Sequence, residues 1–356
     1  MHDFDAPVVA VPARNEEALL PRLVAALSRQ TATRRLGRPL RVVLVLNNIE
    51  DGSRRVVRAA ARRAANLHMT VVDVEFPPGR AHVGSARRLA LDIAARQAPH
   101  GVVMTTDADA VPADDWVEEN LRAIRAGAHI VGGRIVGDPE EERRLGRGFL
   151  HRARAHARYQ ALCDELASLL DPIGHDPWPR HHDHTGASIA VRADVYRAVG
   201  GMDPLPFRED LAFVSKARAA GFRLRHAPEV SVTVSARTIG RARGGMADCL
   251  RNWMRQETQG VPLLLESPEA VEGRLRLRRA IRDLDGLEPY AACRRLRQWG
   301  LAPAGGARQP RQFSACELIE RFAADDPDAQ GTVAAASAIA TLERRIAELR
   351  GLADAA

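Results

Sequence analysis

Strand and helix patterns alternate along the first 135 residues of this 356-residue chain. Short runs rich in Val, Leu and Ile predict buried strands, and apolar residues between them recur at helical spacing. The predicted strands are residues 7–11, 41–46, 69–74, 101–106 and 129–135, and the predicted helices are residues 16–30, 52–66, 83–97 and a segment from about residue 114. This alternation predicts right-handed βαβ units and an α/β fold with a mainly parallel, Rossmann-like central sheet flanked by helices.

The fourth predicted strand ends in two carboxylates, Asp107 and Asp109, with only Ala108 between them. Asp is depleted from strands, so the pair belongs just past the carboxyl end of the strand, where ligands bind in open α/β sheets. Two hard oxygen ligands at this spacing suit Mg²⁺ or Mn²⁺, particularly when substrate phosphates complete the coordination. The alternative is a capped turn, because Asp114 and Asp115 soon begin a helix.

The first strand-to-helix turn argues against a dinucleotide cofactor. Residues 11–16 read Val-Pro-Ala-Arg-Asn-Glu, with no Gly-x-Gly-x-x-Gly. That glycine pattern is what allows a backbone to approach the pyrophosphate of NAD or FAD.

Further motifs follow the predicted strands in a fixed order. They are residues 9–17 (Val-Ala-Val-Pro-Ala-Arg-Asn-Glu-Glu), 46–53 (Leu-Asn-Asn-Ile-Glu-Asp-Gly-Ser), 84–88 (Gly-Ser-Ala-Arg-Arg), 107–109 (Asp-Ala-Asp), and 199–203 (Val-Gly-Gly-Met-Asp) with 208–211 (Arg-Glu-Asp-Leu). In this order the chain resembles family-2 glycosyltransferases of the GT-A fold, over roughly residues 7–240. The resemblance implies a nucleotide-diphosphate sugar donor, a divalent metal ion and an acceptor hydroxyl.

The resemblance also assigns donor and metal residues. Asp107 and Asp109 match the metal motif, and Asn48 stands where the family often has Asp, so that uridine is favoured as the base but not determined. Arg88 stands where the family often has Asn, and Arg87 is the better candidate for a diphosphate contact. The nucleotide-binding residues that the resemblance implies are Pro12, Ala13, Asn15, Glu16, Asn48, Arg87, Asp107 and Ala108.

The catalytic assignment rests on Glu209 and Asp210, which match the Glu-Asp motif of the family. In the favoured, inverting reaction, Asp210 takes the proton of the attacking hydroxyl. Two alternatives stay open: the pair only satisfies a helix dipole, or the enzyme is a retaining transferase acting on a small acid such as phosphoglycerate. The acceptor-side residues are Gly200, Gly201, His184 and Gly186.

A histidine often completes the metal shell in GT-A enzymes, but residues 232–237 contain none. The alternatives are water and donor phosphates, or a histidine of the segment 181–184, which otherwise lines the acceptor pocket or caps its loop. Arg237 follows the last predicted core strand and is a candidate contact for the donor diphosphate.

Composition indicates which classes of binding partner the chain favours. The net charge is +7, which favours anionic substrates or surfaces, but aromatic residues make up 4% and no nucleic-acid motif is present. The 4 cysteines are far apart, which predicts reduced thiols and a cytoplasmic protein. We recognise no signal peptide, no membrane-spanning run and no Gln-x-x-Arg-Trp motif, so a non-processive enzyme is expected.

The predicted organisation is a catalytic domain over residues 1–245 and a helical C-terminal extension over 246–356. Residues 1–135 form the nucleotide-sugar half, and residues 136–245 form the acceptor half with a helical insertion at 140–170. Arginines in this insertion predict a solvated basic face or a peripheral membrane contact. The apolar stripe of the helix at 332–349 packs on its own domain or on a partner subunit of a homo-oligomer.

Two further function classes are compatible with an acidic α/β site. A nucleotidyltransferase is disfavoured because its Gly-rich loop is missing after the first strand. A silent sugar-nucleotide-binding protein is disfavoured because Asp107, Asp109 and Asp210 are all present.

Overall fold

The computed structural model describes residues 4, 6–240, 245–301, 314–326 and 329–354. Contacts divide the chain into two compact units. The first comprises residues 1–154, 179–214 and 223–261, and the second comprises residues 155–178, 215–222 and 262–356. This division differs from the predicted boundary after residue 245, because helix α7 (Arg147–Leu170) and helix α9 (Glu209–Ala219) each contribute residues to both units.

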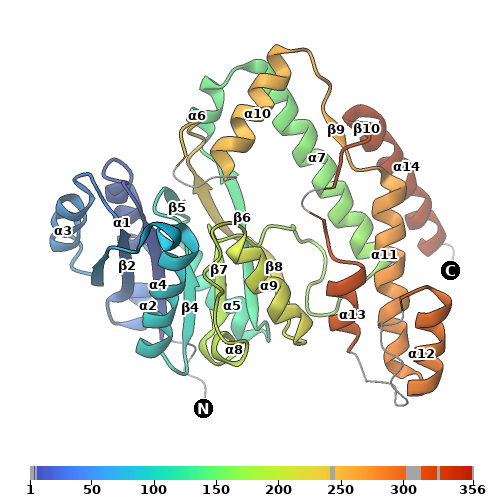
Figure 1. The fold of residues 1–356 in the computed structure, drawn as a ribbon, viewed down its shortest axis with the longest axis horizontal. Coiled ribbons are helices and arrows are strands. Elements are labelled where there is room, and N and C mark those ends of the chain that lie inside the picture. Colours follow the sequence, from blue (N-terminus) through green and yellow to red (C-terminus); the bar gives the residue numbers. More distant parts are fainter. Residues whose placement is uncertain (1–3, 5, 241–244, 302–313, 327–328, 355–356) are drawn as a thin grey trace. The chain divides into compact units, whose positions relative to one another are not determined.

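The first unit is built on an eight-stranded sheet, and Figure 1 labels β2, β4, β5, β6, β7 and β8 of it. Their order is β3-β2-β1-β4-β7-β6-β8-β5. The strands are β1 (Pro7–Ala13), β2 (Leu40–Asn47), β3 (Leu67–Val74), β4 (Val102–Thr105), β5 (Ala110–Pro112), β6 (Ile130–Gly137), β7 (Ile189–Arg192) and β8 (Leu224–Val234). β1 to β4 are mutually parallel and β6 is parallel to β8, whereas β7 and β5 run antiparallel to their neighbours. The predicted mainly parallel α/β sheet is confirmed.

Helices follow the strands, as the alternating pattern predicts. The helices of this unit that lie before α7 are α1 (Leu20–Ser28), α2 (Ala32–Leu36), α3 (Ser53–Arg63), a 3₁₀ turn η1 (Pro78–Arg80), α4 (Val83–Gln97), α5 (Trp116–Arg125) and α6 (Pro139–Arg144); α8 (Ala193–Ala198) and α10 (Met246–Thr258) come later. Local caps set some of their starts: the His82 imidazole accepts from Ser85 N at α4, and Asp138 accepts from Glu140 N and Glu141 N at α6.

The sequences of β1 and β2 are almost continuously apolar because both strands lie in the core. Every residue of β1 is buried, because helices cover both faces of this part of the sheet. Trp116 at the start of α5 is fully buried, and its indole N–H donates to Ser188 Oγ at 2.8 Å. This bond ties α5 to the residue that precedes β7.

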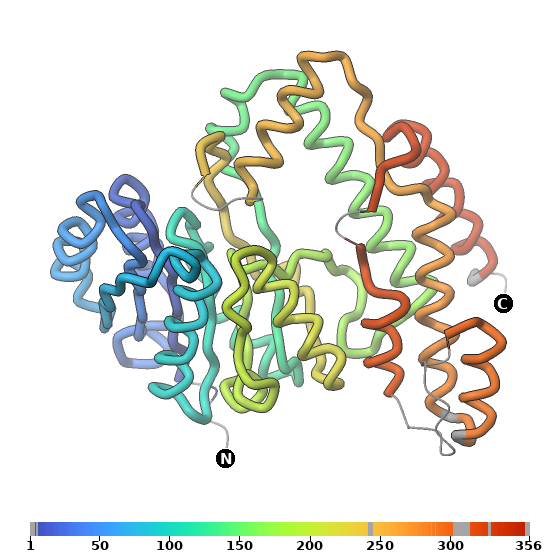
Figure 2. The backbone as a smooth tube through the Cα atoms, in the orientation of Figure 1, coloured from blue at the N-terminus to red at the C-terminus, as the bar shows by residue number. Residues whose placement is uncertain are grey.

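The second unit is helical. The last turns of α7, together with α11 (Pro268–Arg282) and α14 (Ala335–Asp354), run side by side (Figure 2) and share one apolar core. Its remaining elements are η2 (Asp283–Gly286), α12 (Pro289–Gln298), α13 (Ala315–Phe322) and a two-stranded sheet of β9 (Leu264–Leu265) and β10 (Val333–Ala334). On α14, Leu342 and Ile346 are buried against this core, so the predicted stripe packs within its own unit.

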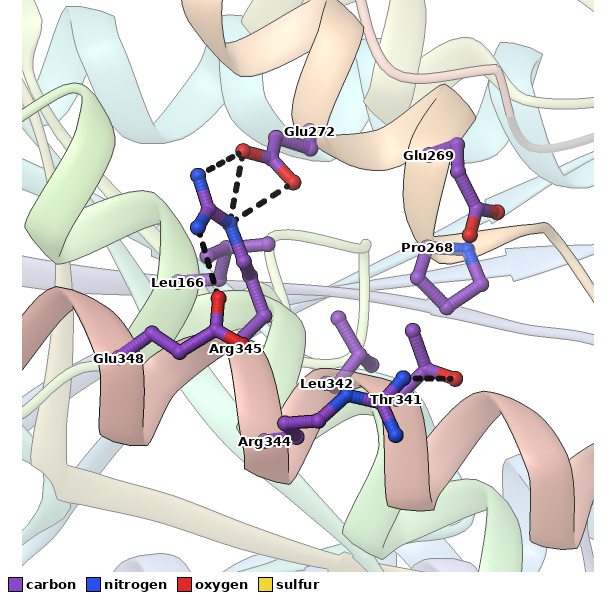
Figure 3. Close-up of a pocket in the computed structure, with 9 residues that line it drawn as sticks. All are labelled: Leu166, Pro268, Glu269, Glu272, Thr341, Leu342, Arg344, Arg345 and Glu348. Atoms are coloured by element: carbon purple, nitrogen blue, oxygen red, sulfur yellow. Dashed lines mark hydrogen bonds and ion pairs between the residues drawn. The ribbon is translucent and has the colours of Figure 1, made fainter.

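A cavity of about 210 Å³ lies between α11 and α14 (Figure 3). Arg345 on its wall binds Glu272 and Glu348, with nitrogen-to-oxygen distances of 2.9 Å to each. Arg345 is therefore paired with two carboxylates of the cavity wall, and Arg344 donates to Thr341 Oγ1 at 3.5 Å. No helix in the described part of the chain has the length and apolarity needed to cross a bilayer.

We expect Trp116→Phe to lower the free energy of unfolding by about 1–3 kcal/mol, because the buried Ser188 hydroxyl loses its donor. Urea unfolding followed by circular dichroism measures the change. The matched control is Trp178→Phe, whose side chain is 44% exposed and which should change stability by less than about 0.5 kcal/mol. Equal effects of the two substitutions would contradict this role of the Trp116 indole.

Candidate active site

The candidate site lies where the carboxyl ends of β1, β2 and β4 meet the beginning of β7. Strand register puts these ends at one edge of the sheet, since β4 pairs parallel with β1 and antiparallel with β7. Asp107, Ala108 and Asp109 form the short turn between β4 and β5, and Ala110 N donates to the Asp107 carbonyl at 3.2 Å. The acidic motif is therefore held in the predicted place, just past a buried strand.

Arg87 on α4 connects this turn to three other parts of the site. Its guanidinium donates to Asp107 Oδ1 (2.8 Å), Glu209 Oε1 (2.9 Å), Thr105 Oγ1 (3.1 Å) and the Gly186 carbonyl (2.9 Å). The side chain is only 4% exposed. Burial by itself lowers the pKa of Arg87, but the nearby carboxylates, Asp107 first and then Glu209, outweigh it, so the pKa is raised and the charge is retained.

Gly186 is required by this packing. A Cβ at this residue would lie 2.4 Å from Cζ of Arg87, so no larger side chain fits beside the guanidinium. The Gly186 N–H donates to Asp210 Oδ2 at 2.6 Å, while its carbonyl accepts from Arg87. One residue thus links the buried arginine to the carboxylate predicted as the base.

Glu209 and Asp210 open α9 but have different surroundings. The Glu209 side chain is 4% exposed and paired with Arg87, whereas Asp210 is half-buried. Asp210 accepts from Gly186 N through Oδ2 and from Leu211 N through Oδ1 at 2.8 Å. The two backbone donors fix the orientation of the Asp210 carboxylate. Glu209 does more than satisfy a helix dipole, because it neutralises a buried cation.

A second arginine binds the other carboxylate of the acidic turn. Arg237 Nη2 lies 3.0 Å from Asp109 Oδ2, and the same guanidinium forks onto Glu16 with distances of 2.7 and 2.5 Å. The pKa of Asp109 is raised to about 7, first by burial and then by the negative charge of Asp107, while Arg237 opposes the shift. The ionised form of Asp109 is therefore destabilised by burial and by the second negative charge of the turn.

The chemistry of these residues fits a divalent cation. Asp107 and Asp109 offer hard oxygen ligands, and the surplus negative charge is relieved by a cation. Within the described residues, no group of three His, Cys, Asp or Glu side chains is arranged to hold a metal. Any remaining ligands would come from donor phosphates and water.

The predicted nucleotide residues lie at the ends of β1 and β2. Pro12 and Ala13 are the last residues of β1. Asn15 and Asn48 both have positive φ, and Asn15 Oδ1 accepts from Glu50 N at 2.8 Å. Asn48 bonds to the backbone of Phe76 through its amide nitrogen (2.9 Å) and its amide oxygen (3.0 Å). Its amide is thus engaged within the protein, and its contact with a base stays a prediction.

The structure adds two buried polar atoms that the sequence analysis did not single out. Asn47 Oδ1 at the end of β2 and Thr106 Oγ1 just past β4 are buried without a hydrogen-bond partner among the described residues. Both are polar residues that end an apolar strand, which is the signal that identified Asp107. Their free acceptors lie beside the residues assigned to the donor.

The other acceptor-side residues divide into two groups. Gly200 and Gly201 have positive φ and end α8, with N–H groups that donate to Arg197 O and Tyr196 O, so their clear role is to terminate a helix. His184 lies in a histidine cluster, with its Nδ1 3.1 Å from His226 Nε2.

His181 belongs to the same cluster. Burial and then His226 lower the pKa of His181 to about 4, so the imidazole is neutral at pH 7. Asp183 N donates to His181 Nδ1 at 3.0 Å, and His181 Nε2 lies 3.2 Å from the Ala227 carbonyl. These contacts hold the ring within the protein.

The predicted solvated basic face of the helix at 140–170 is wrong for Arg152. Its side chain is 6% exposed and pairs with Glu257 at 2.5 Å. Within the second unit, Arg158 pairs with Glu343 at 2.7 Å. Arg158 is still 54% exposed, so the correction concerns Arg152, onto which folding brings a carboxylate of α10.

Residues 8–176 match the family model described as "Glycosyl transferase family 2", and Glu209 and Asp210 lie beyond the matched segment. Comparison with curated proteins gives no significant match.

Similar solved structures include mannosyltransferase PcManGT from Pyrobaculum calidifontis in complex with GDP-Man and Mn²⁺, with 20% identity, coverage of 85% of this chain and 76% of that chain, and a TM-score of 0.47. S. aureus TarS 1–349 is 16% identical, with 82% and 84% coverage and a TM-score of 0.45. Glucosyl-3-phosphoglycerate synthase from Mycobacterium tuberculosis in complex with Mn²⁺ and UDP-glucose is 15% identical, with 74% and 84% coverage and a TM-score of 0.41. Likenesses this distant do not decide donor, acceptor or mechanism.

We expect Arg87→Met to lower the free energy of unfolding by about 3–5 kcal/mol, because Glu209 is left buried without its cation. Adding Glu209→Gln to this variant should restore part of the loss, which a double-mutant cycle of urea unfolding measures. The matched control is the neighbouring, 34% exposed Arg88, whose substitution by Met should cost about 1 kcal/mol or less. A loss at residue 87 as small as that at residue 88 would contradict this role.

Proposed function

Because residues 8–176 belong to glycosyl transferase family 2, we propose that this glycosyltransferase is metal-dependent and non-processive and acts with inversion. It moves a sugar from a nucleotide-diphosphate donor, with a UDP-sugar favoured, to an acceptor hydroxyl. The observation that carries the proposal is the single buried guanidinium of Arg87 that connects Asp107 with Glu209, the neighbour of Asp210. An acidic turn and a candidate base are thereby held together.

The donor half of the reaction needs the negative charge of the leaving diphosphate to be neutralised. Asp107 and Asp109 would hold the divalent metal ion, which supplies that neutralisation when bound. Arg87 holds the Asp107 carboxylate in one orientation through the 2.8 Å bond. The guanidinium of Arg237 is a second cation next to the acidic turn, and its forked N–H groups suit a diphosphate.

The acceptor half needs a base on the face opposite the leaving group. The acceptor oxygen attacks the anomeric carbon, the bond to the diphosphate oxygen breaks, its electron pair leaves with the diphosphate, and the proton passes to Asp210. Gly186 N and Leu211 N orient this carboxylate, and its partial exposure leaves it accessible to a substrate. Glu209 acts as a positioning residue through its pair with Arg87.

A panel of nucleotide sugars, assayed with Mn²⁺ or with chelator, tests the function. We expect UDP-sugars to raise the melting temperature only with metal, since a ligand at a hundred times its Kd adds about 2.7 kcal/mol of stability. Chromatography should detect release of a nucleoside diphosphate. Pyrophosphate release would instead indicate a nucleotidyltransferase, and binding with no turnover would indicate a silent binding protein; either result would overturn the proposal.

We expect Asp210→Asn to lower kcat by about 10²–10⁴-fold, because the amide cannot accept the proton of the acceptor. Donor affinity, measured by calorimetry, should stay unchanged, since the donor contacts come from other residues. The control is Asp114→Asn, a 58% exposed carboxylate paired with Arg29, which should keep the parental rate.

The stereochemistry of the product provides an independent check. An α-linked donor should give a β-linked product, which NMR identifies. An α-linked product, or parental turnover by the Asp210 variant, would favour the retaining alternative, in which the departing phosphate takes the proton of the acceptor.

A further inference from the structure

Each carboxylate of the acidic turn has its own arginine, and the two arginines are held differently. Arg87, which binds Asp107, is 4% exposed and has four hydrogen-bonded partners. Arg237, which binds Asp109, is 25% exposed and is held by two carboxylates, Glu16 and Asp109. Arg87 is thus enclosed by the protein, whereas Arg237 is partly exposed to solvent and its guanidinium bonds to carboxylates.

The position of Arg237 is that of a cation shared by two acids. Its Nη2 atom bonds to Glu16 Oε1 at 2.5 Å and lies 3.0 Å from Asp109 Oδ2. Glu16 and Asp109 are 7% and 22% exposed, so water screens their charges only in part. A guanidinium here offsets the repulsion among Asp109, Asp107 and Glu16 that a divalent ion would otherwise offset.

The backbone before Arg237 is anchored, so the contact is not that of a free surface side chain. Glu141 Oε2 accepts from Ser235 Oγ and from Ala236 N, both at 2.7 Å, and Arg237 N donates to Ser235 Oγ at 3.3 Å. The segment thus presents the arginine side chain to the acidic turn. The paired bonds to Glu16 would retain the guanidinium when Asp109 is taken by another cation.

We propose that Arg237 is the resident cation of the metal-free acidic pair, and that a divalent metal ion displaces it from Asp109 onto Glu16 alone. This inference rests on the proposed metal site at Asp109. Metal binding and the Arg237–Asp109 contact are then mutually exclusive, so by linkage Arg237 weakens the affinity for metal in the absence of nucleotide. The released face of the guanidinium becomes available to the donor diphosphate, so metal is held firmly only when the donor is also present.

The test is a titration of the full chain with Mn²⁺ alone, in which electron paramagnetic resonance measures the free ion. We expect Arg237→Gln to bind Mn²⁺ about tenfold more tightly than the parent, because the competing cation is gone. Arg237→Lys should also bind more tightly than the parent, since an ammonium cannot fork between Glu16 and Asp109. It provides a second variant if Arg237→Gln fails to fold, which circular dichroism detects.

The matched control is Arg14→Gln, which removes the same charge from the turn that carries Glu16. Arg14 donates to the Ala81 carbonyl at 2.8 Å and is paired with none of the three acids. Its variant should keep the parental Mn²⁺ affinity within about twofold, because the Arg14 guanidinium bonds to a backbone carbonyl and not to a carboxylate of the site. An equal gain in the Arg14 and Arg237 variants would reduce the effect to net charge and overturn the inference.

Asp109→Asn separates this inference from the proposed function. If this variant loses Mn²⁺ binding while Arg237→Gln and Arg237→Lys keep the parental affinity or bind more weakly, the metal site stands and the displacement of Arg237 is wrong. If Asp109→Asn binds Mn²⁺ as tightly as the parent, the metal site itself is wrong, and the inference fails with it.

Discussion

The candidate site depends on one buried arginine with two carboxylate partners. Arg87 joins α4 to the turn after β4, to the residue before β7 and to the start of α9. A guanidinium in an apolar interior is costly unless its hydrogen bonds and charge are matched, and Asp107 and Glu209 match them. Their positions are therefore coupled, and loss of the Arg87 guanidinium would leave Glu209 buried without its cation.

The same charge balance distinguishes the carboxylates of the site by their burial and their partners. Glu209 is buried and paired with Arg87, and Asp107 bonds to Arg87 through Oδ1 while its side chain stays 34% exposed. Asp210 is half-buried and accepts hydrogen bonds from two backbone N–H groups. Asp109 is held by the more exposed Arg237. Glu209 thus stabilises the architecture, whereas Asp107, Asp109 and Asp210 keep some exposure to solvent.

The features that depend on local order were predicted well. Apolar runs and helical spacing gave the alternation of strands and helices and the mainly parallel sheet, because buried strands and amphipathic helices have periodic patterns. The family assignment followed from short motifs in order, and the match over residues 8–176 confirms it. Arg152 was expected on a solvated face because arginines are frequent in this insertion, but their number carries no information on which later segment covers the helix. Gly200 and Gly201 matched a motif, but their positive φ values gave them a role in ending α8.

By itself, the sequence determined the α/β class, the family and the place of the acidic turn at a strand end, since these depend on patterns among near neighbours. Only the tertiary structure decided which carboxylates are paired, because the partners of Arg87 come from residues 105, 107, 186 and 209. It likewise joined Arg237 to Glu16, which lies 221 residues earlier. Charges so far apart in the chain interact only after the sheet has brought the strand ends together. Local sequence patterns therefore do not predict these ion pairs.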